Sequence, residues 1–242
     1  MAKKPSKRSK SDKFQKMQQL QMKLGKKEEP LRDDLKRLVE QTDFGVMLRH
    51  PFYNSFIDPT HAALVHYIID EKQKAVQKYI KAKKWDTLLC LYETPFLLDG
   101  YVEHIHFFDD ASYWRLLAHV WTMQEFLWPN QDLFLNLFKS PRPRREALMD
   151  KSEHSEHRKL KDEFPVYRGF IGKRGKGMSW TIDKAKAEWF AKRYSMIKGR
   201  GQPKLASGVV NKTDILAFFN GREESEVVVD PAKVKKQKRQ VL

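Results

Sequence analysis

The chain has 242 residues, of which 40% are hydrophobic and 12% aromatic, with 11 glycines and 11 prolines; this composition excludes a wholly disordered chain, a collagen-like chain and a disulfide-rich scaffold. The formal net charge is +16, and no apolar run approaches the roughly 18 residues that a membrane helix needs. The single cysteine, Cys90, excludes an internal disulfide and a multi-cysteine zinc site. We therefore expect a soluble protein of a reducing compartment, with no membrane partner.

Both ends of the chain are strongly basic. Residues 1–29 contain 10 Lys/Arg and 3 Asp/Glu, and residues 233–242 contain 5 Lys/Arg and no acid, so most of the net charge lies outside the centre. Repelling charges and few aromatic residues predict disordered tails, although 14–24 has the residues for a short helix when bound to a partner. Two roles stay open: an electrostatic hold on nucleic acid or another polyanion, and a solubility tail without a specific partner. No apolar segment follows the N-terminal charges, so no secretory signal is expected.

Residues 30–150 are predicted to form a helical domain. Apolar residues recur at helical spacing over 65–80, and from 111 to 127 they occupy nearly all sides of a helix, which indicates burial. Pro129 is expected to end that helix. Cys90 lies in the apolar run TLLCLY and is expected to be buried and unreactive. The polar, charged stretch that follows this domain is interpreted as a connection, with the linker at 151–163.

The segment 164–232 changes period and predicts mixed strands and helix. FPVYRGF (164–170) predicts a strand, the glycine-rich 172–177 predicts a turn, and Asp183 is placed to cap a helix. Two further strands are predicted, at 205–210 and at 224–230. The expected fold class is therefore α+β, an N-terminal helical domain followed by a compact β-sheet domain, with 233–242 as a basic tail.

Three polar groups in this segment are candidates for a site. Arg168 lies among apolar neighbours and needs a partner for its guanidinium, for which a phosphate or carboxylate is well suited. Ser179 and Thr181 precede a helix N-terminus, which favours anions. Glu224 and Glu226 are two residues apart, so on a strand they share one face, where carboxylates repel unless they face a polar or cationic ligand. Taken singly, each group has an ordinary interpretation: a surface ion pair, a helix start and an acidic edge strand.

In this order along the chain, the three groups resemble the Arg–Ser–Glu signature of the ADP-ribosyltransferase superfamily, in the branch typified by clostridial toxins and arginine-specific mono-ADP-ribosyltransferases. VYRGF, GMSWTIDKAKAEWFA and ILAFFNGREESEVVVDP resemble its strand, its serine motif with helix, and its turn-to-glutamate strand. The resemblance covers about 164–232, under a third of the chain. It implies a compact split β-sheet domain, and a small transferase of the kind found in bacteria and their phages, acting in the cytoplasm of a bacterial or phage-infected host cell.

The resemblance also implies roles for individual residues. Arg168 would bind the phosphates and the nicotinamide ribose of NAD, which is consumed as a substrate. Ser179 would brace the cleft and the catalytic glutamate. Glu226 would hydrogen-bond the ribose 2′-hydroxyl and stabilise the oxocarbenium-like centre as nicotinamide leaves, while Glu224 would orient or deprotonate the acceptor. A fixed carboxylate beside the developing charge stabilises the transition state more than the ground state.

Other residues of the same motifs are expected around this site. An aromatic ring would pack against nicotinamide, a glycine would let the ligand approach the backbone, and the turn before the glutamate strand would contact the acceptor. The expected cofactor-binding set therefore also includes Tyr167, Gly169, Trp180 and Thr181, and the acceptor-binding set is Asn220, Arg222 and Glu224.

The leading hypothesis is an NAD-dependent mono-ADP-ribosyltransferase with a macromolecular acceptor. By the resemblance, Glu224 favours an arginine side chain of a protein, while the basic tails keep nucleic acid open as an acceptor. Two other functions stay open: a non-enzymatic nucleic-acid- or virion-associated binding protein, and an NAD glycohydrolase that transfers to water. No metal site is expected, because the histidine pairs at 104 and 106 and at 154 and 157 lack a third ligand in register.

Overall fold

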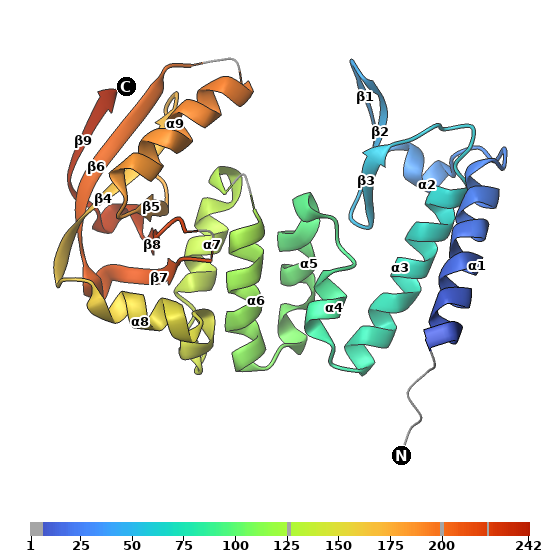
Figure 1. Ribbon diagram of the computed structural model, residues 1–242, viewed down its shortest axis with the longest axis horizontal. Coiled ribbons are helices and arrows are strands. Elements are labelled where there is room, and N and C mark those ends of the chain that lie inside the picture. Colours follow the sequence, from blue (N-terminus) through green and yellow to red (C-terminus); the bar gives the residue numbers. More distant parts are fainter. Residues whose placement is uncertain (1–6, 125–126, 199–200, 222) are drawn as a thin grey trace. The chain divides into compact units, whose positions relative to one another are not determined.

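The computed structural model describes residues 7–124, 127–198, 201–221 and 223–242, and the chain divides into two compact units, Met1–Phe107 and Phe108–Leu242. It is 50% helix and 24% strand, with two antiparallel sheets, which confirms the α+β class (Figure 1). The boundary falls inside the segment 30–150, which was expected to be one helical domain. Within the described ranges, no helix combines the length and the apolar character that a membrane crossing requires.

The first unit is not wholly helical, contrary to the prediction for 30–150. A three-stranded sheet follows a short helix, and its tight turn uses Gly45 at a φ of +131°, where Thr42 Oγ1 donates to the Gly45 carbonyl at 2.8 Å. Cys90 is exposed rather than buried, because Leu88 and Leu89 take the inward positions of that helix. The elements are α1 (Lys7–Gly25), α2 (Asp33–Lys36), β1 (Val39–Thr42), β2 (Gly45–His50), β3 (Tyr53–Phe56), α3 (Ala63–Lys81), α4 (Trp85–Leu89) and α5 (Leu97–His104).

The second unit is built on a six-stranded antiparallel sheet with the strand order β7-β8-β5-β4-β6-β9. Three of its helices precede the sheet in the chain and the fourth, α9, lies across it (Figure 1). Asp183 caps α9 as predicted, accepting a hydrogen bond from the Lys186 amide at 3.2 Å. The elements are α6 (Asp110–Met123), α7 (Gln131–Phe138), α8 (Lys151–Lys159), β4 (Glu163–Ile171), β5 (Ser179–Thr181), α9 (Lys184–Lys198), β6 (Pro203–Asn211), β7 (Ile215–Phe219), β8 (Glu226–Val229) and β9 (Lys235–Val241).

Three segments that charge patterning assigned to tails or linker are regular structure. The expected linker 151–163 contains α8, which begins with a capping box between Asp150 and Glu153. The expected tail 233–242 contains β9, which pairs with β6 although nearly all of its side chains are exposed. The expected tail 1–29 contains α1. For two of these segments the charge pattern gave a wrong prediction because backbone pairing holds β9 and a capping box begins α8, and neither depends on an apolar stripe.

The two faces of the central strands carry different partners. Residues of one face form the apolar core of this unit, with Val166 and Val227 fully buried and Trp180 at 2% exposure. On the other face α9 packs against Gly169, where an added Cβ would lie only 1.9 Å from the carbonyl oxygen of Ala187. Gly169 therefore serves the helix–sheet contact, whereas the sequence had suggested that it lets a ligand approach the backbone.

We expect Gly169→Ala to lower the free energy of unfolding by about 1–3 kcal/mol or more, because α9 must move away from the sheet to admit the methyl group. Urea unfolding measures the change. The control is Gly221→Ala, where no atom lies within 4 Å of the added Cβ. Equal stability of the two variants would contradict this account of α9 packing.

Candidate functional site

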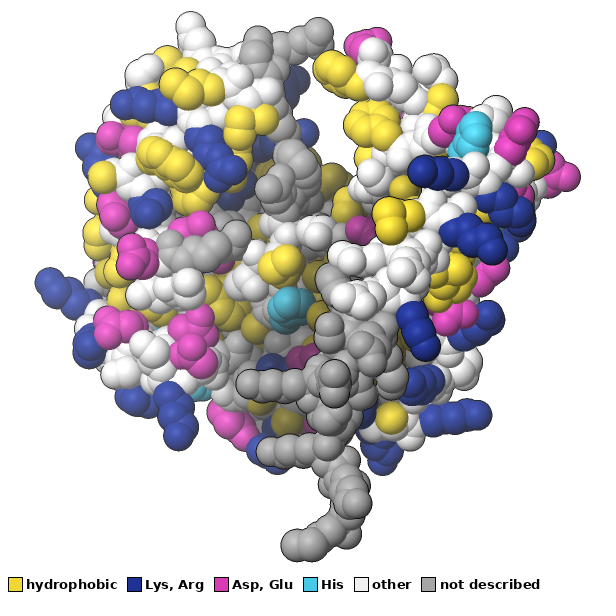
Figure 2. Space-filling view, turned by 45° about the vertical axis from the view of Figure 1, so that its right-hand side comes forward, with side chains coloured by type: hydrophobic (Ala, Val, Ile, Leu, Met, Phe, Trp, Pro, Cys, Tyr) yellow, Lys and Arg dark blue, Asp and Glu magenta, His cyan; other side chains and the backbone are white. Residues whose placement is uncertain are grey.

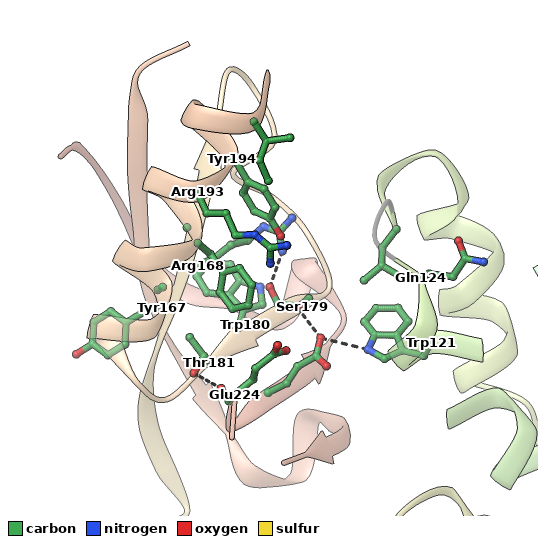
Figure 3. Close-up of a pocket in the computed structure, with 16 residues that line it drawn as sticks. Trp121, Gln124, Tyr167, Arg168, Ser179, Trp180, Thr181, Arg193, Tyr194 and Glu224 are labelled. Carbon is green, nitrogen blue, oxygen red and sulfur yellow. Dashed lines mark hydrogen bonds between the residues drawn. The ribbon is translucent and has the colours of Figure 1, made fainter. Parts of the chain in front are cut away.

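Arg168, Ser179 and Glu226 lie on three neighbouring strands, β4, β5 and β8. Ser179 faces Val228 across the β5–β8 ladder, and Thr181 faces Glu226, so the side chains of Ser179 and Glu226 project from the same face. The Ser179 hydroxyl donates to Glu226 Oε1 at 2.5 Å (Figure 3). The register thus brings together two of the three residues that the sequence singled out.

The Glu226 carboxylate is buried, at 9% exposure, and a second donor holds it from outside the sheet. The indole Nε1 of Trp121, on α6, donates to Glu226 Oε1 at 3.2 Å (Figure 3). Phe134 and Phe138 of α7 meet the Trp121 ring edge-on, with centroids 5.0 and 5.1 Å away. Sequence analysis identified this tryptophan only as part of a buried helix, and no motif linked it to a carboxylate 105 residues later.

The Arg168 guanidinium bridges β4, β5 and the loop between them. Nη1 donates to the Ser179 carbonyl at 2.6 Å, and Nε donates to the Arg174 carbonyl at 3.3 Å. A Cβ on Gly177 would lie 2.4 Å from the Arg168 Cζ, so this glycine makes room for the guanidinium. Burial lowers the pKa of Arg168, while the nearby Tyr194 and Glu226 counteract the shift; an arginine in a protein nevertheless stays charged.

These side chains line a cavity of about 230 Å³. Strands β4, β5 and β8 form one wall, α9 contributes Phe190, Arg193 and Tyr194, and α6 contributes Trp121. The rings of Phe190 and Tyr194 are stacked at 5.9 Å, and burial raises the pKa of the Tyr194 hydroxyl. The cavity therefore combines cationic, anionic and aromatic surfaces, and the sequence had assigned neither Phe190 nor Tyr194 to the site.

Glu224 lines the same cavity, but not for the reason that its spacing suggested. The predicted strand 224–230 begins only at Glu226, and Ser225 has a φ of +44°, so period-two alternation does not relate the two carboxylates. Thr181 Oγ1 instead donates to the Glu224 carbonyl at 2.7 Å and fixes the turn. Figure 3 shows the Glu224 side chain directed into the cavity from this turn.

The two predicted nicotinamide-stacking rings are not placed for that role. Trp180 borders the cavity, but its indole belongs to the apolar core and donates to the Gly177 carbonyl at 2.7 Å, because alternation along β5 turns it away from Ser179. Figure 3 shows the Tyr167 ring directed away from Arg168 and Glu224.

The side chains of Thr181 and Asn220 form hydrogen bonds to backbone groups. Thr181 Oγ1 accepts from the Asp183 amide at 3.0 Å, at the start of α9. Asn220 Oδ1 accepts from the Ser225 amide at 3.1 Å and closes the turn between β7 and β8. Both residues therefore position Glu224 and Glu226 through the backbone. Arg222, predicted to contact the acceptor, lies outside the described residues.

A search of protein-family models, curated proteins and solved structures found no match to the chain. Within the described ranges, no group of three or more His, Cys, Asp and Glu residues is placed to hold a metal ion.

We expect Trp121→Phe to lower the free energy of unfolding by about 1.5–3 kcal/mol, because the variant keeps an aromatic ring but removes a donor to a buried carboxylate. In a Glu226→Leu background, the same change should cost less than about 1 kcal/mol, because its partner is gone. Denaturant unfolding of the four proteins measures the coupling.

The matched control is Trp114→Phe, on the same helix, which removes an indole bond to the Pro143 carbonyl at 2.8 Å. Trp114→Phe should lower the free energy of unfolding by the same amount with or without Glu226. If Trp121→Phe lowers the free energy of unfolding by the same amount with and without Glu226, the hydrogen bond between Trp121 and Glu226 contributes nothing to stability.

Proposed function

We propose that the chain is an NAD-dependent mono-ADP-ribosyltransferase. The observation that carries the proposal is the convergence of Arg168, Ser179 and Glu226, from three adjacent strands, on one cavity with a hydrogen bond between Ser179 and Glu226. Strands that are consecutive neighbours in the sheet carry these residues in the order that the resemblance to the Arg–Ser–Glu family implies. The ordinary interpretations of the single motifs do not account for their meeting at one place.

In the proposed reaction, the N-glycosidic bond between nicotinamide and ribose C1′ breaks, and nicotinamide leaves with the bonding electron pair. The positive charge that develops at C1′ is stabilised by the Glu226 carboxylate, whose orientation is set by Ser179 and Trp121 before the reaction begins. A nucleophilic atom of the acceptor then bonds to C1′ and gives up its proton to Glu224. Two carboxylates at one cavity thus divide the work of stabilising the cation and accepting the proton.

The charges and rings of the cavity fit the reacting end of NAD. Arg168 has five N–H groups, of which two are used by hydrogen bonds to described residues, and it lies in the cavity with Arg193, so two guanidinium groups are available near a diphosphate. Phe190 and Tyr194 offer an aromatic wall for the nicotinamide ring. A cavity of about 230 Å³ is smaller than the roughly 300–1,000 Å³ that encloses a drug-sized ligand, so the adenosine end would lie along the open rim.

The acceptor would approach from the turn that carries Glu224. This carboxylate also borders a second hollow, lined by His119 and Glu153, so it is reached from two sides. By the resemblance, a glutamate here favours a guanidinium acceptor, that is, an arginine side chain of a protein, with nucleic acid as the other acceptor class. A carboxylate suits a guanidinium because it pairs with the cation and takes up the released proton.

We expect the wild-type chain, incubated with NAD and a cell lysate, to release nicotinamide and attach ADP-ribose to a macromolecule. Glu226→Gln should reduce nicotinamide release by about 10²–10³-fold, because it removes the charge that faces the developing cation. Glu224→Gln should reduce transfer to the acceptor more than nicotinamide release, because its role begins after bond cleavage. Doubly labelled NAD, followed by mass spectrometry of the modified macromolecules, measures both steps.

Glu223→Gln is the matched control, since this neighbouring carboxylate is exposed and does not line the cavity. It should release nicotinamide as the wild type does, because it leaves the charges of the cavity unchanged. A wild type without nicotinamide release, or a Glu226→Gln variant as active as the Glu223→Gln variant, would overturn the proposal. Free ADP-ribose as the sole product would instead identify an NAD glycohydrolase.

A further inference from the structure

One edge of the second sheet collects basic residues that the site does not use. They come from the loop 172–177 between β4 and β5, from the start of β6 and from β9, and all are exposed or half-buried. We call this set the β9 edge surface; it consists of Lys173, Arg174, Lys176, Lys204, Lys235, Lys236, Lys238 and Arg239.

The segments that carry these cations supply no acidic residue to balance them. The segments 172–181, 201–211 and 231–242 contain no Asp or Glu at all. None of the eight cations forms an ion pair with any residue in the described ranges. The face of the molecule shown in Figure 2 differs from the β9 edge surface, because basic and acidic side chains are interspersed on it. Eight cations without counter-charges repel one another, and folding gains nothing from placing them together.

Contacts between the elements join these cations into one surface. A Cβ on Gly175 would lie 3.1 Å from Arg239 Nε, so β9 lies against the loop. Lys204 Nζ donates to the Gly172 carbonyl at 3.5 Å, which ties β6 to the other end of the same loop. Pairing with β6 places Arg239 opposite Ala206 and Lys238 opposite Ser207, so the cations of β9 project on both sides of the edge.

The same surface adjoins the cavity. The Arg174 carbonyl accepts from Arg168 Nε, which lines the cavity, and the Arg174 charge is close enough to add to the effect of burial in lowering the Arg168 pKa. A ligand that neutralises the β9 edge surface would therefore pass within reach of the cavity mouth.

We propose that the β9 edge surface binds the phosphate backbone of a nucleic acid. The seven residues of β9 extend over roughly 20 Å, which presents cations in a row that suits a linear chain of phosphates. Lysines on an edge strand also protect it from pairing with other strands, but that purpose does not explain the cations of the loop and of β6. The binding does not depend on the proposed transferase activity; where that activity holds, the polymer is held beside the reacting centre.

Charge and exposed apolar area together favour nucleic acid over a membrane. Surface-bound membrane proteins insert large apolar or aromatic side chains beside their basic residues. On the described parts of β9 and the loop, Val241 is the large hydrophobic side chain that is exposed, at 56%, and it lies at the end of the strand. Leu242, which directly follows the strand, is 37% exposed. These described segments thus offer many phosphate contacts and, apart from the two C-terminal residues, no large exposed apolar side chain.

Fluorescence anisotropy with a labelled single-stranded oligonucleotide tests the proposal on the full chain across a salt series. We expect measurable binding, and we expect the logarithm of the association constant to fall linearly with the logarithm of the salt concentration. The triple variant Lys235→Gln, Lys236→Gln, Lys238→Gln should reduce that slope by about 2, at about 0.7 for each phosphate that is no longer neutralised, and weaken binding about tenfold at moderate salt.

The matched control neutralises the same number of exposed lysines in the first unit, with Lys81→Gln, Lys83→Gln and Lys84→Gln, and should bind almost as the wild type does. A second test variant, Lys173→Gln with Lys176→Gln, leaves β9 pairing intact and should also weaken binding, which guards against a misfolded strand.

Three outcomes would overturn the proposal. The first is no oligonucleotide binding by the wild type, and the second is an equal reduction of binding in the control and test variants. The third is binding to phosphatidylserine vesicles, reduced by the β9 changes, without binding to the oligonucleotide. Because the assay contains no NAD, its failure leaves the transferase proposal standing, and an inactive enzyme leaves this one standing.

Discussion

The buried carboxylate of Glu226 is the constraint on which the second unit depends. Taking a charge out of water costs several kcal/mol unless donors replace its hydration. Two of these donors come from different directions, the Ser179 hydroxyl within the sheet and the Trp121 indole from α6. Both bonds require one register of β5 against β8 and one position of α6. The group that would do the chemistry is therefore also the group that joins helix to sheet, so structure and proposed function rest on the same oxygen atom.

Arg168 applies a second constraint, with the opposite charge. The β4–β5 pairing sets Tyr167 opposite Thr181, and the Arg168 guanidinium donates to the carbonyl of Ser179, at the start of β5. The sheet thereby holds a cation where two strands separate, and Gly177 leaves the space for it. Ser179 of β5 thus contacts both charges: its carbonyl oxygen accepts from the Arg168 guanidinium, and its hydroxyl donates to the Glu226 carboxylate. The cavity therefore has a cationic part and an anionic part. In the proposed reaction, these charges would face a dinucleotide whose phosphates are negative and whose reacting sugar becomes positive.

The structure changes the interpretation of the basic residues at the C-terminal end of the sequence. In the sequence, the basic residues of 233–242 looked like a solvated tail. In the structure they belong to a paired strand, next to a loop whose cations come from about 60 residues earlier in the chain. A disordered tail samples many positions and binds a polyanion loosely, whereas a strand fixes its charges relative to one another and to the cavity. The entropic cost of ordering the backbone that carries these side chains is thus met on folding, before any partner arrives.

Sequence alone determined the elements whose side chains repeat with a period: the buried helix α6, the strand around Arg168, the helix after Asp183, and the residue types of the site. It could not identify β9 or the first-unit hairpins, because backbone pairing holds them and leaves little trace in hydrophobicity. It paired Glu224 with Glu226 by strand alternation, whereas a positive φ at Ser225 brings them to one cavity. Only the tertiary structure joined Trp121 to Glu226 and brought Phe190 and Arg168 to one cavity, because contacts between distant segments depend on packing, and local sequence does not encode which partner a buried ring will meet.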